Sequence, residues 1–480
     1  MSRSLSAAIS ILVASSYILV LAPELLGEIE IPREAVFIGC IFGIGIFWSL
    51  SGKLTNTPLI LAPAVGLLVF TNQFYFAING DPGIDITAYN LLLTSAIVGG
   101  IVLLASKIRG QILNAIPEPV RLGINASVGT LLATTAIKSL TTTFTTDPIP
   151  YAAALGAVIG GTVLVIFYGM RAKASRDSTA TSRLDPKRLL VNSYYLGSFI
   201  LACALFLLID LISGGTEVAW IPVEEIFIAD NLILEGWKGI TRTESFALLG
   251  YGLVILFVLL TDIPGTPFAL LDKTEDKIRE EYRNKAITGS FVVDGVASVG
   301  YPLLGLTPPI YYSENIVVKD FEANSAGSSE TVWSGRPAIL MGFACIFVAV
   351  ILVGLHYAEL LPGLPLLPEV LVAPILLLLS LVIISNGMIS ERERRPVENT
   401  PDSSQPVNSR TFQFYMPTAA AIVTTPFLGL AFGLCFACLA YIIVKLSGEP
   451  ELQKEERGEL WIVMSLAVVS ALISVLINFA

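Results

Sequence analysis

The chain has 480 residues, of which 54% are hydrophobic and only 14% charged, and its mean hydropathy is +0.75. This composition excludes a soluble globular protein and predicts a polytopic protein embedded in the lipid bilayer. The formal net charge of -10 comes largely from acidic loops, which argues against nucleic acid or anionic lipid as a partner.

Apolar stretches long enough to cross a bilayer as a helix of about 20 residues recur along the whole chain. They lie at residues 9–26, 35–52, 58–78, 88–106, 119–138, 151–170, 191–212, 246–270, 286–305, 337–357, 366–386, 413–446 and 459–479. The stretch 413–446 is interpreted as two short helices. The first stretch runs into Pro23 without a small-residue cleavage site, so we interpret it as a membrane helix and not as a signal peptide.

Basic residues in the loops predict the orientation. If the N-terminus is cytoplasmic, the inner loops contain Lys53, Lys107 and Arg109, whereas the outer loops 79–87 and 139–150 contain no Lys or Arg. Cytoplasmic loops carry an excess of these residues. We therefore expect a protein of the cell membrane with its N-terminus in the cytoplasm.

Two places interrupt the helical pattern in a related way. "TPLILAPAVG" begins at Thr57 and "TPPIYYSENI" begins at Thr307, and in both a Thr-Pro pair precedes a few residues that favour extended backbone. Prolines remove N–H donors and resist continuous helix. Broken helices at matching positions of two inverted halves are typical of transport sites near the membrane midplane. The pattern predicts that residues 57–63 and 307–311 form short extended segments that face each other.

Acidic residues lie in or beside these apolar segments. Asp262 is midway along an apolar run, Glu314 follows the second break, and Asp294 is a third candidate. An ionisable residue inside a membrane segment is a functional candidate by default; an interfacial acid at a helix end is the alternative for Glu314. The sequence has no metal-binding spacing, P-loop or dinucleotide fingerprint, and Cys435 and Cys438 are interpreted as packing residues. We therefore expect neither a cofactor nor an enzyme.

Several segments resemble the nucleobase-cation symporter family, which includes uracil, xanthine and ascorbate permeases, and most of all its AzgA-type purine permease branch. The similar segments are "SSYILVLAPELL", "PLILAPAVGLLVF", "IPEPVRLGINASVGTLLA", "FVLLTDIPGT" and "MPTAAAIVTTPFLGLAFG" with "YIIVKLSG". The span from Asp294 to Glu314 fits without a gap. The resemblance covers nearly the whole chain.

The resemblance implies an all-α polytopic membrane protein of about fourteen segments in two inverted repeats of seven, with short extended pieces breaking segments 3 and 10. The repeats would span residues 1–212 and 246–446, separated by the acidic loop 213–245 and followed by a hydrophobic extension, 447–480. Segments 1–4 and 8–11 would form a core domain that carries the substrate, and segments 5–7 and 12–14 a gate domain. Whether the protein forms a homodimer stays open.

The resemblance also implies a site. In this family, acids of the eighth and tenth segments bind the nucleobase, and these positions correspond to Asp262 and Glu314. Further matching positions are Thr266, Ser313 and, as backbone contacts to the ring, Ala64, Val65 and Gly66. A carboxylate can accept two N–H bonds from a base, and half-helix amides can donate to its carbonyls. Either acid is a candidate to exchange a coupling proton, and we favour Asp262.

Two departures leave the transported base open, because Leu259 and Leu68 replace the Asp of "FVDLFDT" and the Asn of "GMGLN" in the branch. The favoured hypothesis is proton-coupled uptake of a nucleobase, most readily a purine, by an elevator mechanism. The alternatives are sodium coupling, transport of uracil, a carrier of the same fold for a small anion such as sulfate or bicarbonate, and, from another class, a membrane enzyme or a passive channel.

Overall fold

The computed structural model describes residues 3–79, 85–111, 116–146, 150–176, 194–213, 220–221, 232, 234–237, 240–261, 280–312, 315, 318, 334–358, 364–365, 369–394, 407–448, 460–461, 463–468 and 470–471. Its helices are α1 (Arg3–Ser15), α2 (Ile18–Gly27), α3 (Arg33–Thr55), α4 (Val65–Ile78), α5 (Ala88–Ala105), α7 (Glu118–Thr145), α8 (Tyr151–Arg176), α10 (Tyr194–Ser213), α12 (Arg242–Thr261), α14 (Glu280–Leu303), α16 (Arg336–Tyr357), α17 (Ala373–Arg394), α18 (Val407–Leu428) and α19 (Leu430–Gly448). The strands are β1 (Leu61–Pro63), β2 (Trp220–Ile221), β3 (Pro309–Tyr311) and β4 (Leu364–Pro365).

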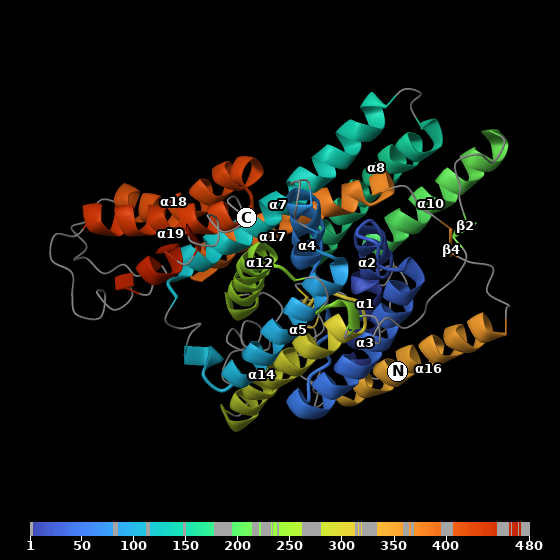
Figure 1. Ribbon diagram of the computed structural model, residues 1–480, viewed down its shortest axis with the longest axis horizontal. Helices are drawn as coiled ribbons and strands as arrows, with labels where there is room; N and C mark the ends of the chain where they lie inside the picture. The colour runs from blue at the N-terminus through green and yellow to red at the C-terminus, as the bar shows by residue number, and fades with distance from the viewer. Residues whose placement is uncertain are drawn as a thin grey trace.

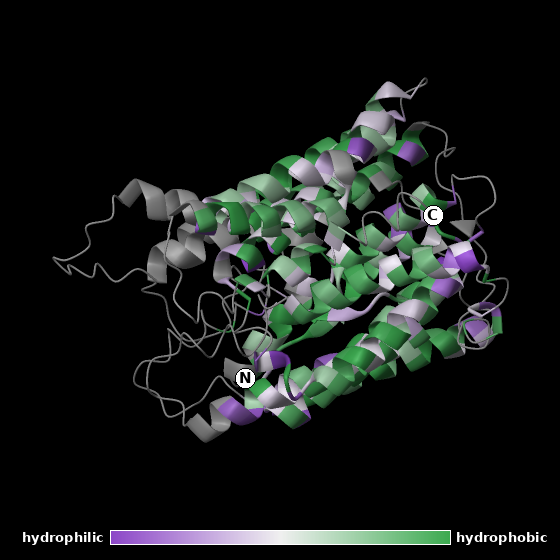
Figure 2. Ribbon diagram, turned by 60° about the vertical axis from the view of Figure 1, so that its left-hand side comes forward, coloured by the Kyte–Doolittle hydropathy of each residue, from purple (hydrophilic) through white to green (hydrophobic). Residues whose placement is uncertain are grey.

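The helices account for the apolar stretches of the sequence. Six of the described helices are long and apolar enough to cross a membrane, and apolar residues run along nearly every helix in Figure 2. The stretch 413–446 does divide into two helices, separated by Gly429 in a left-handed conformation with φ of 83°. The protein is thus an integral membrane protein.

The first apolar stretch differs from the expectation of one continuous helix. It is interrupted between α1 and α2, where the Leu19 amide donates to the Ser16 carbonyl and the Val20 amide to the Tyr17 carbonyl. These bonds span three residues, as in a 3₁₀ turn, so the regular α-helical pattern is broken at this point. Tyr17 is buried at the interruption.

The helices pack in two groups, as Figure 1 shows. In one group, α3 packs against α16, α14 and α2, and α5 packs against α14 and α12. In the other, α7 packs against α17, α18 and α19, and α8 packs against α10. Helix α4 lies between the groups, because it contacts α2 on one side and α7 on the other.

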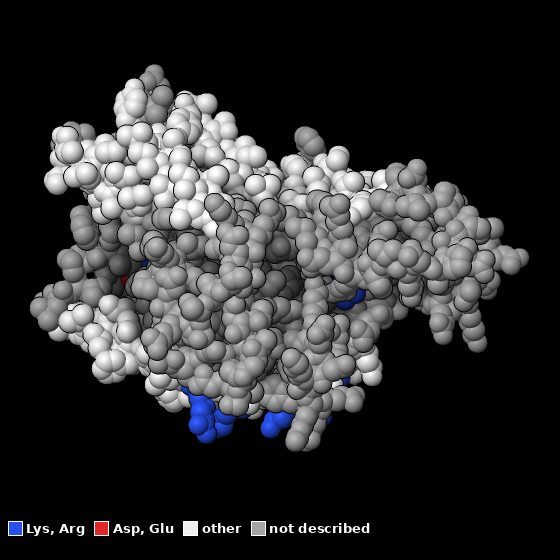
Figure 3. Space-filling model, turned by 180° about the vertical axis from the view of Figure 1, so that it is seen from behind, with Lys and Arg blue, Asp and Glu red and all other residues white. Residues whose placement is uncertain are grey.

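The outer surface is apolar, as a lipid-facing surface must be. Helix α16 is the clearest case, since Leu340, Phe343 and Phe347 are all more than half exposed. In the view from behind, the most visible Lys and Arg side chains project from the lower edge (Figure 3). The exposed apolar side chains of α16 are therefore suited to contact with lipid acyl chains.

The two predicted extended segments are confirmed. Strands β1 and β3 pair antiparallel, with Leu61 opposite Tyr311, Ala62 opposite Ile310 and Pro63 opposite Pro309. The strands are shorter than the predicted ranges 57–63 and 307–311. A second pair joins β2 to β4. At the C-terminal end, the Cys435 thiol of α19 donates to the Ala467 carbonyl at 3.6 Å, which places the described part of the last hydrophobic stretch against α19.

Candidate functional site

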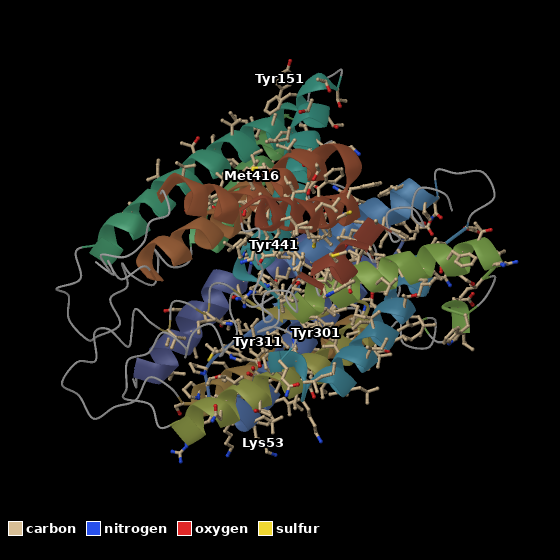
Figure 4. All side chains as sticks on the ribbon, turned by 90° about the vertical axis from the view of Figure 1, so that its left-hand side faces the viewer. Lys53, Tyr151, Tyr301, Tyr311, Met416 and Tyr441 are labelled. Atoms are coloured by element: carbon tan, nitrogen blue, oxygen red, sulfur yellow. The ribbon has the colours of Figure 1, made fainter. Side chains whose placement is uncertain are left out.

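The β1–β3 strand pair lies in the interior, and Tyr301 and Tyr311 mark its neighbourhood in Figure 4. Ile60, Leu61 and Ala62 have no exposed surface. Pro63 and Pro309 face each other across the pair and have no N–H to contribute. The amide of Ala64 extends the pairing by donating to the Pro308 carbonyl at 3.1 Å.

Tyrosine hydroxyls satisfy backbone carbonyls of β1. The Tyr301 hydroxyl donates to the Leu61 carbonyl at 2.9 Å, and the Tyr312 hydroxyl donates to the Pro63 carbonyl at 2.7 Å. Away from water, an unpaired carbonyl is costly, so these bonds make it possible to interrupt the helix here. Tyr311 itself shares a hydrogen bond of 3.2 Å with Ser51 of α3.

Asn315 pairs through its side chain with Ile60, the residue directly before β1. Its amide nitrogen donates to the Ile60 carbonyl at 3.0 Å, and its amide oxygen accepts from the Ile60 amide at 2.9 Å. The Asn315 side chain therefore makes the two hydrogen bonds that the backbone of a neighbouring strand would otherwise make. Asn315 is completely buried, so these bonds are shielded from solvent.

Helix α4 begins directly after β1. Its N-cap, Ala64, is extended, with φ of -70° and ψ of 113°, and has no side-chain cap. The amides of Val65 and Gly66 therefore lie in the first turn, where no carbonyl of the same helix can accept from them. Such an N-terminus favours a carbonyl or anionic group of a ligand.

An aromatic pair lies close to the same strands. Tyr17, at the interruption between α1 and α2, stacks on Tyr312 with ring centroids 6.1 Å apart and an interplanar angle of 21°. Because Tyr312 bonds Pro63, the pair couples the α1–α2 interruption to β1. Three chain interruptions thus meet in one region.

The same region adjoins α7 of the other helix group. A Cβ atom built on Gly66 would lie 2.3 Å from Val128 Cγ1, so the N-terminus of α4 packs directly on α7. Further along, the Gln73 amide donates to the Thr135 hydroxyl at 2.7 Å. These two contacts join the helix groups.

Arg109 forms a buried ion pair with Asp294. Its guanidinium donates to the Asp294 carboxylate and to the backbone carbonyl of Leu259. Arg109 is 2% exposed and Asp294 3%. The sequence analysis placed Arg109 in an inner loop, whereas the structure buries its side chain. No group of three His, Cys, Asp or Glu side chains within the described part of the chain is arranged to hold a metal ion.

Comparison with known proteins connects this geometry to transport. No protein-family model matches the chain. It is 30% identical over 123 residues to the adenine permease AdeQ of Escherichia coli, which is 26% of this chain and 27% of the relative. It is 29% identical over 120 residues to the guanine/hypoxanthine permease PbuO of Bacillus subtilis, 24% of this chain and 27% of the relative.

The chain resembles the nucleobase permeases. The matches confirm the resemblance noted in the sequence, although the aligned stretch spans only about a quarter of the length of either relative. The fold also matches the transmembrane domain of a cyanobacterial bicarbonate transporter, BicA, with a TM-score of 0.55 at 14% identity over 90% of this chain and 97% of that one. SLC26A9 matches with a TM-score of 0.53 at 11% identity over 93% of this chain and 65% of its own.

The permease resemblance assigned seven residues to the site. Ala64, Val65 and Gly66 lie at the α4 N-terminus beside the strand pair. Four others lie outside the described residues, namely Asp262, Thr266, Ser313 and Glu314. Their flanks are described: α12 is described as far as Thr261, and Tyr312 and Asn315 flank the Ser313–Glu314 dipeptide.

Sequence reasoning missed the residues that hold the strand pair together. Tyr301 is in α14 and reaches Leu61 from 240 positions away in the chain. Asn315 directly follows Glu314 and reaches Ile60. Prolines near β1 remove backbone amides that would otherwise pair with facing carbonyls. Each backbone group of the strand left without such a partner needs a side-chain partner, and counting these groups would have pointed to Tyr301 and Asn315.

Proposed function

We propose that the protein is a secondary active transporter that carries nucleobases, most readily purines, with a proton as the coupling ion. The observation that carries the proposal is the strand pair with the first-turn amides of α4 beside it. The names of the relatives support the substrate class, since they are permeases for adenine and for guanine or hypoxanthine. Transport, and not catalysis, is the activity that those names suggest.

The chemistry of a nucleobase fits this arrangement. A purine presents a planar face and an edge of N–H donors and carbonyl or ring-nitrogen acceptors. The amides of Val65 and Gly66 supply donors from the first turn of α4. Carboxylates at Asp262 and Glu314 would accept N–H bonds from the base. Donors and acceptors would then approach the ring from two broken segments.

We propose different roles for the two acids. Glu314 would chiefly bind substrate and Asp262 would carry the coupling proton. Glu314→Gln replaces an acceptor by a donor and should weaken binding about ten- to a hundredfold, the value of a charge-assisted hydrogen bond. Asp262→Asn mimics a permanently protonated acid and should keep binding and counterflow while losing uptake driven by the gradient. Gradient-driven accumulation by Asp262→Asn would contradict this division.

Movement would occur between the two helix groups. We propose that the group of α3, α5, α12, α14 and α16, together with α2 and α4, is the core that carries the substrate and slides as an elevator against the gate formed by α7, α8, α10 and α17–α19, as the packing supports. Gln73 and Thr135 join the groups directly. A disulfide between cysteines at these two positions, in a background without native cysteines, should block uptake and leave binding measurable. Full uptake after complete crosslinking would exclude sliding at this contact.

The deciding experiment is uptake into proteoliposomes. Radiolabelled adenine, guanine, hypoxanthine, xanthine and uracil are tested with a proton gradient, with a sodium gradient and with neither. We expect saturable accumulation of at least one purine that collapses when a protonophore is added. Failure of every base to accumulate under any gradient would reject the proposal, and non-saturable flux would indicate a channel.

A small anion is the second candidate substrate. The fold similarity to the transmembrane domain of a bicarbonate transporter favours it. Two acids in one site oppose it, because they repel an anion unless they are protonated. Labelled bicarbonate and sulfate therefore belong in the same uptake panel, and accumulation of either in place of a base would favour this alternative.

A further inference from the structure

Charged side chains gather at the end of α2, close to where the two helix groups meet. Glu24 and Glu28 are four residues apart, and Glu28 still has helical backbone, with φ of -69° and ψ of -25°, so both carboxylates lie on one face of α2. Arg33, at the start of α3, forms an ion pair of 2.9 Å with Glu24 and interacts electrostatically with Glu28. The core thus contributes two carboxylates and one guanidinium to this charge cluster.

Contacts within the core hold the charge cluster in place. The Glu28 carboxylate accepts from the Asn72 amide of α4 at 2.6 Å, and the same amide donates to the Leu25 carbonyl at 2.9 Å. A Cβ atom built on Gly27 would clash with Arg33 Cγ, so the Arg33 side chain packs directly on the backbone of α2. Glu28 therefore has little freedom to follow a partner that moves.

Helix α7 faces the charge cluster from the other helix group. Gln73, the residue after Asn72, donates to the Thr135 hydroxyl of α7 at 2.7 Å. Lys138 lies three residues further along α7, on the same face of that helix as Thr135, and interacts electrostatically with Glu28. The second cation near Glu28 therefore comes from the gate.

The charge balance of the cluster depends on where the gate lies. In their ionised forms, Glu24, Glu28 and Arg33 leave one negative charge in excess, and Lys138 balances it. Cys203 of α10, a gate side chain that interacts with Glu24, adds no charge, because an ordinary thiol is neutral at about pH 7. Displacement of the gate along the core would move Lys138 away and leave Glu28, a half-buried carboxylate, with less counter-charge.

We propose that Glu28 and Lys138 form an electrostatic latch between core and gate, which favours the arrangement described here over one in which the gate has moved along the core. The inference rests on the proposed sliding of the two groups and concerns its energetics. Lys138 is exposed and has a flexible stem, so the latch can open without breaking a buried bond. Because exposed ion pairs contribute little, we expect a bias of about two- to fivefold between the two arrangements.

A disulfide between the two groups reports this arrangement. Gln73→Cys and Thr135→Cys are combined in a background without native cysteines. In a glutathione redox buffer, the equilibrium ratio of disulfide to dithiol measures how often the two positions face each other. The equilibrium ratio is used and not the oxidation rate, because a nearby charge alters the reactivity of a thiol. Lys138→Glu should lower this ratio about two- to fivefold. An unchanged ratio would overturn the proposal.

Two further variants test the origin of that decrease. Lys53→Glu is the matched control, because Lys53 is an exposed lysine near the opposite end of α3, about 30 Å from Arg33 along the helix. It should leave the ratio unchanged. Glu28→Gln keeps an acceptor for Asn72 and removes the charge, so adding Lys138→Glu to it should have almost no effect. An equal decrease in Lys53→Glu, or equal effects of Lys138→Glu with and without Glu28→Gln, would overturn the latch.

Salt dependence separates the latch from a purely structural contact and from the proposed function. Added salt screens exposed charges, so it should lower the ratio in the protein with Lys138 and leave it unchanged in Lys138→Met. Equal salt dependence in the two proteins would contradict the latch. None of these measurements uses a nucleobase. If the protein accumulates no base in proteoliposomes, the proposed function fails, while the disulfide ratio still decides whether Glu28 and Lys138 form a latch.

Discussion

The strand pair and the Arg109–Asp294 cluster solve the same problem in different ways. Both supply side-chain hydrogen-bond donors to backbone carbonyls in the interior of the protein. At the strand pair, the donors are neutral: two tyrosine hydroxyls and the Asn315 amide. At α12, the donor to the Leu259 carbonyl is a charged guanidinium whose counter-charge is Asp294.

The two regions differ in how much stability is lost when one hydrogen-bonding partner is removed. Each neutral bond serves one backbone group, so its loss leaves the others in place and costs about 1 kcal/mol, or about 1–3 kcal/mol if a buried group is left unpaired. Loss of one member of a buried ion pair costs about 3–5 kcal/mol, because the other charge stays buried. A region that exchanges partners with a substrate is therefore better built from neutral bonds, and a fixed anchor from charges.

The largest effect that we expect at the strand pair is that of Asn315→Leu. This change removes both bonds to Ile60, so the variant should lose about 2–4 kcal/mol of stability, since two backbone groups stay unpaired. Binding of nucleobase should weaken with it. Thermal unfolding in detergent and equilibrium binding measure the two losses.

Asn79 offers a matched control. Its side chain makes the same two bonds to the amide and carbonyl of Ile86, at 3.0 and 2.8 Å, at the end of α4 away from the strands. Asn79→Leu should lower stability less, because Asn79 is only half-buried, and should leave binding unchanged. Equal effects of the two substitutions on binding would mean that the strand pair has no special role.

Gly66→Ala should have the next largest effect, because it adds a methyl group where α4 meets α7. The new Cβ would lie 2.3 Å from Val128 Cγ1, and β-branched valine has little freedom to move. Overpacking of this kind costs about 1–3 kcal/mol, and here it would separate α4 from α7. We expect a lower melting temperature and slower uptake.

Val128→Ala should restore both quantities in the Gly66→Ala background by making room for the methyl group. Gly100→Ala is the control, because a Cβ on Gly100 of α5 meets no atom within 4 Å. It should leave uptake at the parent rate. If Val128→Ala does not restore melting temperature and uptake, the contact between α4 and α7 is not the cause of the Gly66→Ala defect.

Tyr301→Phe tests whether neutral bonds act separately. It removes one hydrogen bond to Leu61 and keeps the ring, which packs on Phe47 with centroids 5.0 Å apart. We expect a loss of about 1 kcal/mol with the fold intact. Thermal unfolding measures this loss of stability. A loss of about 3–5 kcal/mol, as for a broken buried ion pair, would mean that the bonds of the strand pair depend on one another.

The interrupted segments could be predicted because proline has a local and unambiguous effect. Pro58, Pro63, Pro308 and Pro309 remove amide donors whatever their surroundings, and the structure places strands at or beside them. Apolar stretches likewise identified the helices, since a membrane requires length and hydrophobicity that sequence shows directly.

Partners far apart in the chain could not be predicted in this way. Arg109 resembles any basic residue of an inner loop, and its pairing with Asp294 depends on the close packing of α5 on α14, seen at Gly99 and Gly295. Asn315 has no periodic pattern that marks its bonds to Ile60. Such pairings depend on how helices pack, which a hydropathy pattern does not specify.

The smallest effect that we expect concerns Glu28, at the C-terminus of α2, where neutral and charged partners meet. Its carboxylate accepts from Asn72 of α4 at 2.6 Å, and Arg33 lies close enough to interact electrostatically while forming an ion pair of 2.9 Å with Glu24. Burial raises the pKa of the Glu28 carboxyl above its usual 4.5, and the Asn72 bond, Arg33 and Lys138 only partly oppose the rise.

A carboxyl whose pKa is higher in the folded than in the unfolded protein contributes stability that is fully present below the unfolded pKa and lost as pH rises through the folded pKa. The parent should therefore lose some stability as pH rises from 4.5 through the raised pKa of Glu28. Glu28→Gln cannot ionise and its amide oxygen still accepts from Asn72, so its melting temperature relative to the parent should increase over that pH range. A melting-temperature difference that stays constant with pH would show that the charges of Arg33 and Lys138 fully offset the effect of burial. Glu28 would then behave like the Arg109–Asp294 ion pair and not like the neutral bonds of the strand pair.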